Sequence, residues 1–248
     1  SLFSPPHCQD NVARRIEFHK GIRVIPLQTP TLPPATHTNC YLLGNGELLV
    51  VDPGASEEGE RVKLLLQIEE LRSEGMRPLA VVLTHHHGDH VGGAAWLKER
   101  LELPLWAHQL TAERLPFACE RMVADGERIS LVGSPPMRFT ALHTPGHAPG
   151  HLCFYDELSG AMIAGDMVAS VGTILVETTD GDMAQYLASL ARMDALAPSV
   201  LLQAHGGPIR AAHEKLTGYI AHRLLRERNV LAALRADPRP RAVFALVP

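Results

Sequence analysis

Apolar and polar positions along the chain predict strands and helices in alternation. Residues 40–51 are predicted to form a β-hairpin, because Asn45-Gly46 separates two apolar runs and Asn-Gly is the strongest short hairpin signal. A helix is expected to follow, with Ser56 as its N-cap and Gly75 just past its end. The alternation favours an α/β fold.

One arrangement occurs four times: an apolar run of strand length ends in His or Asp beside glycine. The runs are residues 79–83, 137–142, 161–164 and 200–204. Side chains in such places lie on loops that a rigid scaffold holds, which suits them for chemistry. The side chains predicted there are His85, His87, Asp89, His90, His147, Asp166 and His205.

Two helices are predicted in the last third of the chain. Asp182 is expected to cap the first, whose apolar residues follow helical spacing from Met183 to Met193. A longer helical pattern covers residues 211–236. We expect this second helix to pack beside the His/Asp cluster, with Leu216, Ile220 and Leu224 toward the main domain.

Composition narrows the class of protein. The 248 residues suit one large domain with room for a small appendage. With 46% hydrophobic and 20% charged residues the composition is typical of a globular protein, and the net charge of −4 gives no overall footprint for nucleic acid. The four cysteines are far apart and are expected to be reduced thiols. With no apolar run near the ~20 residues that span a bilayer, and no recognisable signal peptide, we expect a cytoplasmic protein without membrane association.

The densest group of candidate ligands lies between Thr84 and His90. In an extended stretch residues two apart face the same side, so His85 and His87 face one way and His86 the other. Asp89 and His90 follow at the turn into a helix. Because a catalytic zinc keeps about three protein ligands, these groups suffice for one metal and begin a second site.

The remaining strand-end residues complete two adjacent sites. Asp166 is the candidate bridge between His147 and His205, because one carboxylate can bind two cations. The nitrogen and oxygen ligands suit two Zn²⁺ ions, but also Fe or Mn. Without a metal, their convergence would carry heavy desolvation and repulsion costs.

These motifs resemble the metallo-β-lactamase superfamily. Thr84–His90 matches the H-x-H-x-D-H signature, and Val51–Gly54 is similar to the upstream V-D-x-G element. The resemblance covers about residues 21–207 and implies an αβ/βα four-layer sandwich with the metals at one edge. The later single-ligand motifs match at Thr144–His147, Gly165-Asp166 and Ala204–Gly206.

The resemblance also implies roles for individual residues. A hydroxide held between the metals would be the nucleophile, and Asp89 would be catalytic by orienting it or moving its proton. Position by position, His85, His87 and His147 would bind the first metal, Asp89, His90 and His205 the second, and Asp166 both.

Four further residues have less specific expectations. Asp52 is either bonded to a ligand histidine or part of a plain Asp-Pro-Gly turn. His151 is either a loop histidine or a contact to substrate or to a ligand. His86 is expected to be structural or to face solvent, and His143 to belong to a strand or the core.

The C-terminal stretch resembles the lactamase-β-2-like branch, which includes endoribonucleases acting on single-stranded RNA. The similar residues are Tyr219–Arg223 with Arg226-Glu227, where Arg223 and Arg226 could form a basic strip. We therefore expect a catalytic domain in residues 1–210. Residues 211–248 would form a helical extension, incomplete at the start of a winged-helix-like domain.

Two alternatives stay open beside the endoribonuclease. Thr144–Phe154 also resembles the glyoxalase II-like thioesterases, which favours a small thioester, ester or lactone as the substrate. A non-catalytic module that binds nucleic acid or protein is the third hypothesis. The sequence leaves the oligomeric state undetermined.

Overall fold

The computed structural model describes residues 15–236, and a seven-stranded sheet forms its N-terminal half. The first four strands pair antiparallel and the rest pair parallel. In spatial order the strands are β1 (Ile16–His19), β2 (Ile22–Gln28), β3 (His37–Leu43), β4 (Glu47–Val51), β5 (Arg77–Val82), β6 (Leu105–Ala107) and β7 (Arg121–Met122).

A second sheet of five strands carries the later ligand motifs. Four of its strands pair antiparallel, and the strand that is last in the sequence lies at one edge and pairs parallel to its neighbour. In spatial order the strands are β12 (Val200–Gln203), β11 (Ala161–Gly165), β10 (Leu152–Asp156), β9 (Met137–His143) and β8 (Arg128–Leu131).

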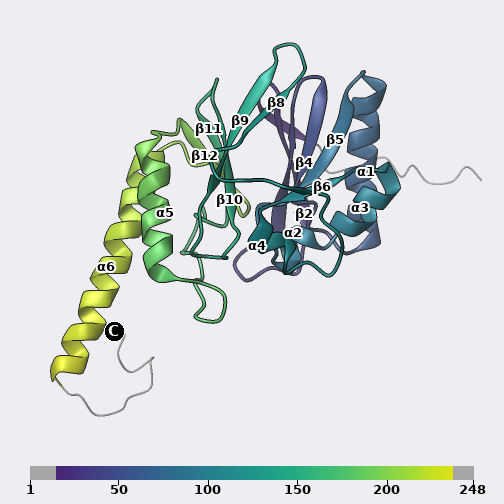
Figure 1. Cartoon of the computed structure of the whole chain (residues 1–248). Helices are drawn as coiled ribbons and strands as arrows, with labels where there is room; N and C mark the ends of the chain where they lie inside the picture. The colour runs from purple at the N-terminus through teal and green to yellow at the C-terminus, as the bar shows by residue number, and fades with distance from the viewer. Residues whose placement is uncertain (1–14, 237–248) are drawn as a thin grey trace, which may run out of the picture.

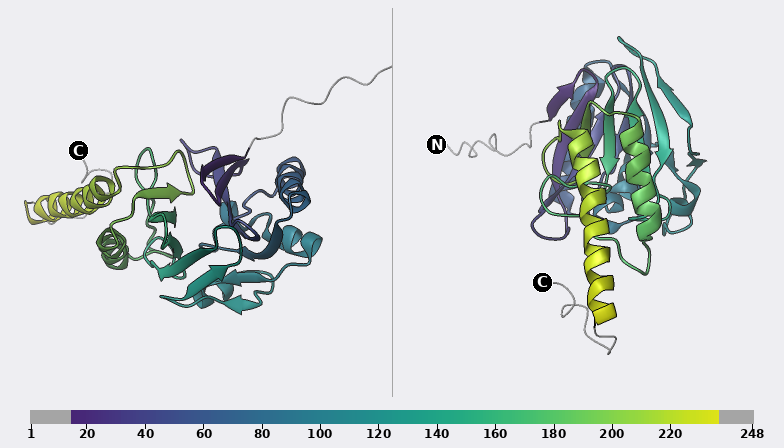
Figure 2. Two further views of the ribbon diagram at one scale, coloured as in Figure 1. Left: turned by 90° about the horizontal axis from the view of Figure 1, so that it is seen from above. Right: turned by 90° about the vertical axis from the view of Figure 1, so that its left-hand side faces the viewer.

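The two sheets face each other and helices cover their outer faces (Figures 1 and 2). One buried apolar cluster fills the space between the sheets, and two more join each sheet to its helices. This arrangement confirms the predicted αβ/βα four-layer sandwich. The helices are α1 (Glu58–Ser73), α2 (Gly88–Val91), α3 (Ala94–Leu101), α4 (Gln109–Ala112), α5 (Met183–Ala195) and α6 (Ala212–Ala236).

The first hairpin agrees with the sequence prediction, but the start of the next helix does not. β3 and β4 pair across Asn45-Gly46 as expected. The predicted Ser56 cap is wrong, because α1 begins at Glu58 and its N-cap residue Glu57 makes no side-chain cap. Acidic residues in the first turn favour this helix end electrostatically. Gly75 follows α1 with a φ of +93°, the left-handed conformation that favours glycine there.

The two C-terminal helices lie side by side on the second sheet, and α6 extends well beyond α5 (Figure 2). Asp182 caps α5 by accepting a hydrogen bond from the Gln185 backbone N–H. Along α6, Leu216 is buried and Ile220 packs on the same cluster, but Leu224 is 40% exposed. The prediction that Leu224 faces the main domain is therefore wrong.

Some sequence predictions lie beyond what the structure tests. The predicted start of a winged-helix-like domain falls on residues 237–248, outside the described part of the chain. The division at residues 210/211 stays a prediction. Among the described helices, none has the length and apolar character needed to cross a bilayer.

Candidate metal centre

The first group of donor atoms consists of three imidazole nitrogens. His85 and His87 lie between β5 and α2, and His147 lies on the loop after β9. His85 Nε2 is 3.0 Å from His87 Nδ1, and His147 Nε2 is 2.9 Å from the same atom. The structure thus brings the three residues predicted for the first metal within reach of one ion.

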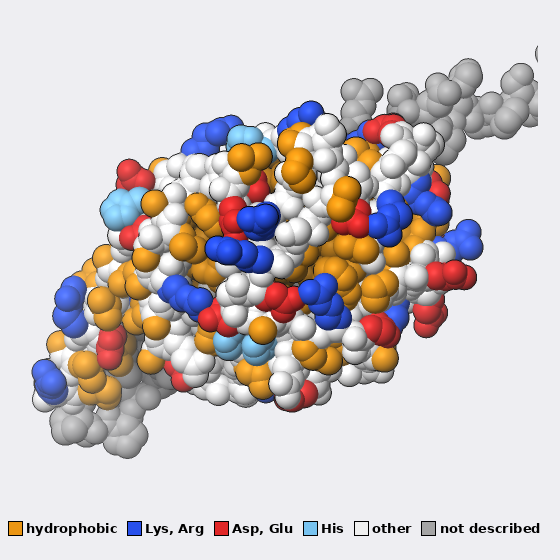
Figure 3. Space-filling model, turned by 45° about the horizontal axis from the view of Figure 1, so that its top comes forward, with side chains coloured by type: hydrophobic (Ala, Val, Ile, Leu, Met, Phe, Trp, Pro, Cys, Tyr) orange, Lys and Arg blue, Asp and Glu red, His pale blue; other side chains and the backbone are white. Residues whose placement is uncertain are grey.

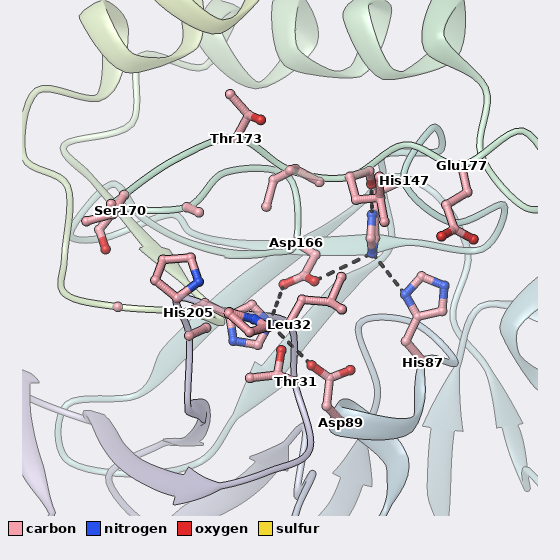
Figure 4. Close-up of a pocket in the computed structure, with 18 of the residues that line it drawn as sticks. Thr31, Leu32, His87, Asp89, His147, Asp166, Ser170, Thr173, Glu177 and His205 are labelled. Carbon is pink, nitrogen blue, oxygen red and sulfur yellow. Dashed lines mark hydrogen bonds and ion pairs between the residues drawn. The ribbon is translucent and has the colours of Figure 1, made fainter. Parts of the chain in front are cut away.

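A second group lies next to the first and shares Asp166. His205 Nε2 is 3.4 Å from Asp89 Oδ2 and also 3.4 Å from Asp166 Oδ1. His90 Nε2 is 3.5 Å from the same Asp166 oxygen. The other oxygen, Asp166 Oδ2, lies 3.5 Å from His147 Nε2 in the first group. Asp166 therefore faces both groups, as a bridging ligand must (Figure 4).

The donor atoms fit a pair of metal ions. His90 Nε2 and Asp166 Oδ1 are buried and lack a hydrogen-bond partner among the described residues. Buried polar atoms of native proteins are almost always paired, so such atoms in a cluster of donors indicate room for a cation. Nitrogen and carboxylate donors without thiolate match Zn²⁺, Fe and Mn alike.

Each histidine of the cluster is held by its far ring nitrogen, which fixes the ring and its tautomer. Four of them present Nε2 to the cluster, while His87 presents Nδ1. The far nitrogen of His85 is bonded to Thr84 Oγ1, that of His87 to Asp180 Oδ2, and that of His90 to Asp52 Oδ2. The far nitrogens of the other two are bonded to backbone carbonyls, His147 to that of Leu175 and His205 to that of His37.

The electrostatics differ between the two groups. Burial, with His90 and His147 nearby, holds the pKa of His85 well below its usual value, and burial also lowers the pKa of His147. Burial alone would lower the pKa of His90, but the Asp166 and Asp52 carboxylates raise it well above its usual value. Neutral imidazoles are the form that binds metal, so the lowered pKa values of His85 and His147 favour an ion, while a cation at His90 would compete with a proton.

Asp52 does more than form a turn. One carboxylate oxygen accepts a 2.8 Å hydrogen bond from the Thr84 backbone N–H. The other oxygen accepts bonds from Thr84 Oγ1 at 2.6 Å and from His90 Nδ1 at 2.8 Å. Of the two expectations for Asp52, the contact to a predicted ligand histidine is the one observed.

His151 is buried beneath the cluster and lies away from the pocket. Its Nδ1 is 2.8 Å from Thr144 Oγ1, and its Nε2 accepts a hydrogen bond from the Asp166 backbone N–H. Gly165 allows this contact, because a Cβ there would lie 2.4 Å from His151 Nε2. His151 thereby holds the backbone of the candidate bridging residue.

Asp180 is the residue that the sequence analysis missed. It lies in a Thr-Thr-Asp-Gly-Asp turn before α5, where composition indicates a turn and nothing more. Its Oδ2 is 3.0 Å from His86 Nε2 and 3.1 Å from His87 Nε2. Of the two expectations for His86, the structural one is observed, because its ring is bonded to Asp180 and is mostly buried. His143 ends β9 as expected and stacks on His108.

A cavity of about 680 Å³ opens above the donor atoms. Its floor includes His87, Asp89, His147, Asp166 and His205, which point into it (Figure 4). Two loops form the walls, residues 30–35 and 169–177. Asp89, the predicted catalytic residue, is thus both in the second donor group and exposed to a ligand in the cavity.

The basic strip predicted for RNA is not formed. The Arg223 guanidinium donates to the Ile174 backbone carbonyl and lies over the Tyr186 ring, so it is committed to the fold. Arg226 is exposed on α6. On the face that Figure 3 shows, Lys and Arg side chains lie among acidic ones. The RNA substrate itself stays an untested prediction.

Comparison with known proteins identifies the family. A family model for the metallo-beta-lactamase superfamily matches residues 33–205, which include all seven donor residues. The chain belongs to the metallo-beta-lactamase superfamily. The resemblance seen in the sequence is thereby confirmed at the level of the superfamily, while the lactamase-β-2-like branch stays a prediction.

Several members of the superfamily resemble the chain. An atrochrysone carboxyl ACP thioesterase of Aspergillus chevalieri is 33% identical over 201 residues, covering 80% of this chain and 60% of that protein. A hydroxyacylglutathione hydrolase of Xylella fastidiosa (strain M23) is 36% identical over 153 residues, covering 61% and 52%. The structure of a metallo-beta-lactamase family protein from Thermus thermophilus superposes with a TM-score of 0.75 at 26% identity, covering 88% and 84%. The chain thus spans little more than half the length of these two sequence relatives.

Proposed function

We propose that the protein is a hydrolase of thioesters that holds two metal ions. The observation that carries the proposal is the pair of donor groups joined by Asp166 at the floor of a cavity. Two relatives named for thioester chemistry, a thioesterase and a hydroxyacylglutathione hydrolase, favour that substrate over RNA. The oligomeric state and the cytoplasmic location stay predictions.

The residues divide between two proposed sites. When bound, the metals would lower the pKa of water and polarise the thioester carbonyl. His85, His87 and His147 would hold one ion, Asp89, His90 and His205 the other, and Asp166 both, with Zn²⁺, Fe or Mn as candidates.

Asp89 is proposed to orient the attacking water. Burial acts to raise its pKa, but the hydrogen bond from His205 and the nearby His90 outweigh this and lower the pKa to about 2. The carboxylate is therefore ionised at neutral pH and is able to accept a hydrogen bond from the attacking water. An oriented water removes part of the entropic cost of the attack.

The proposed reaction balances without any further reactant. The oxygen of water bonds to the acyl carbon and the carbon–sulfur bond breaks. The sulfur leaves with the electron pair of that bond and takes up one proton of the water. The products are a carboxylic acid, which releases its proton to solvent at neutral pH, and a thiol.

Thiol release from metal-loaded protein tests the proposal. A chromogenic thiol reagent would follow hydrolysis of a simple acyl thioester, with single-stranded RNA tested in parallel. We expect thiol release by the parent, and a loss on the order of 10²-fold for Asp89→Asn with the fold retained by circular dichroism. RNA cleavage without thiol release would favour the endoribonuclease, and no turnover of either substrate would favour the binding module.

A further inference from the structure

The walls of the cavity above the donor atoms are unusually apolar for a solvent-exposed surface. Leu32, Val171 and Leu175 line it and are 65%, 71% and 50% exposed. Large apolar side chains that gather at one exposed place commonly mark a binding surface. Figure 4 shows Leu32 between Asp166 and Asp89, with Ser170 and Thr173 of the other wall beyond Asp166.

Apart from the donor residues, the charged side chains that line the cavity within the described part of the chain are acidic. Two further carboxylates line it, Glu177 and Asp180, and its lining includes no Lys or Arg within residues 15–236. Arg114 is nearby, but its Nε lies 3.6 Å from Asp180 and its guanidinium donates to the Leu110 carbonyl. An anionic group that lies against Glu177, away from the donor atoms, would thus meet like charge, which costs binding energy.

The wall formed by residues 169–175 is held from behind by α6. Tyr219 Oη accepts a hydrogen bond from the Ala169 N–H at 3.2 Å and donates one to the Gly172 carbonyl at 2.8 Å. Arg223 donates to the Ile174 carbonyl. These bonds give the wall a defined shape, and a preformed wall binds with less ordering cost than a mobile loop.

We propose that the cavity selects thioesters whose acyl group is uncharged and apolar, with Leu32, Val171 and Leu175 as specificity-determining residues. The proposal rests on thioester hydrolysis as the function and names its substrate class. The reacting carbonyl lies at the donor atoms and the acyl chain lies along the apolar walls. A carboxylate at the end of the acyl chain, as in a succinyl thioester, fits this lining poorly.

Thioesters of N-acetylcysteamine separate the acyl group from the leaving group, because the thiol stays the same and is neutral. Acetyl, octanoyl and succinyl thioesters give a short, an apolar and an anionic acyl group. For the parent we expect kcat/KM for octanoyl to exceed that for acetyl and for succinyl by about tenfold or more. Full burial of one methylene is equivalent to about fourfold, so partial burial of the longer chain suffices.

Two variants report on the wall and its charge. Val171→Asp should lower the octanoyl-to-acetyl ratio of kcat/KM by about tenfold. Val132→Asp is the matched control, because Val132 is 72% exposed on a different part of the surface and should keep the parent's ratio. Glu177→Lys should raise succinyl turnover relative to octanoyl, because it replaces the repelling charge with an attracting one.

The outcomes separate the two proposals. If the parent hydrolyses thioesters but favours succinyl, or treats all three alike, the apolar selection is overturned and the proposed function stands. If no thioester is hydrolysed, the function fails, and calorimetry with the uncleavable S-octyl-N-acetylcysteamine thioether still tests the cavity. Binding that Val171→Asp weakens and Val132→Asp does not supports the selection; equal binding by both variants, or none by the parent, refutes it.

Discussion

Replacing Asp180 with Asn should weaken the first metal site while the fold persists. The carboxylate accepts from the far nitrogens of His86 and His87 through a single oxygen, at 3.0 and 3.1 Å. Asparagine keeps one acceptor oxygen and loses the negative charge. His87 then loses the partner that fixes its ring, and the imidazole that we propose as a ligand becomes less basic.

The magnitude follows from these two contacts. Hydrogen bonds to a charged group contribute about 1.5–3 kcal/mol and those to a neutral group about 1 kcal/mol. The Asp180 side chain is 23% exposed, so solvent screens it only in part. When Asn removes its charge, His87 loses its charged partner, and we expect metal binding to weaken about 10- to 100-fold, the usual range when the partner of a ligand histidine is removed. The free energy of unfolding of the metal-free protein should change by at most about 1 kcal/mol, because partly exposed ion pairs stabilise little.

Competition with a chromogenic chelator measures the metal affinity, and urea unfolding of metal-free protein measures the stability. Asp194→Asn is the matched control, because Asp194 also pairs with a histidine, His213 at 2.9 Å, and its side chain is 22% exposed. It should leave metal affinity as in the parent. Equal affinity of Asp180→Asn and the parent, or an equal loss in both variants, would refute the positioning role of Asp180.

Two further predictions concern the core and a buried thiol. Phe139→Ala should lower the free energy of unfolding by about 3–5 kcal/mol, since Phe139 is fully buried between the sheets; denaturant unfolding measures this, and a change under about 1 kcal/mol would contradict it. Burial raises the pKa of Cys153 to about 12, so only about one thiol in ten thousand is ionised at pH 8. Iodoacetamide should label Cys153 in unfolded but not in native protein, as peptide mass mapping would reveal.

The sequence was most informative where a motif follows an apolar run. His147, Asp166 and His205 follow β9, β11 and β12, which run the same way in one sheet, so their convergence could be predicted. Their meeting with His85 and His87, which follow β5 of the other sheet, depends on how the two sheets face each other. The alternation of strands and helices indicated an α/β fold, and the resemblance of the motifs to the metallo-β-lactamase superfamily implied the four-layer architecture. That these residues bind metal remains the proposal to be tested.

The partners of the ligand histidines could not be predicted. Asp180 is 93 residues from His87 in the sequence, and no local pattern joins them. The partner of His147 is the carbonyl of Leu175, and a backbone group carries no residue identity at all. Leu224 shows the opposite error: its helical spacing matched an apolar face, but the structure leaves it 40% exposed.

The hydrogen bonds from Tyr219 and Arg223 to residues 169–175 join a later part of the chain to an earlier one, so this wall is completed late in synthesis. A ribosome makes the chain from its N-terminus, so every proposed metal ligand up to His205 is synthesised before these two side chains exist. The wall over the donor atoms receives its hydrogen bonds from α6 only when that later helix docks. All the candidate ligands therefore precede, in the sequence, the helix that completes the wall above them, and the cavity takes its final shape only when α6 has docked.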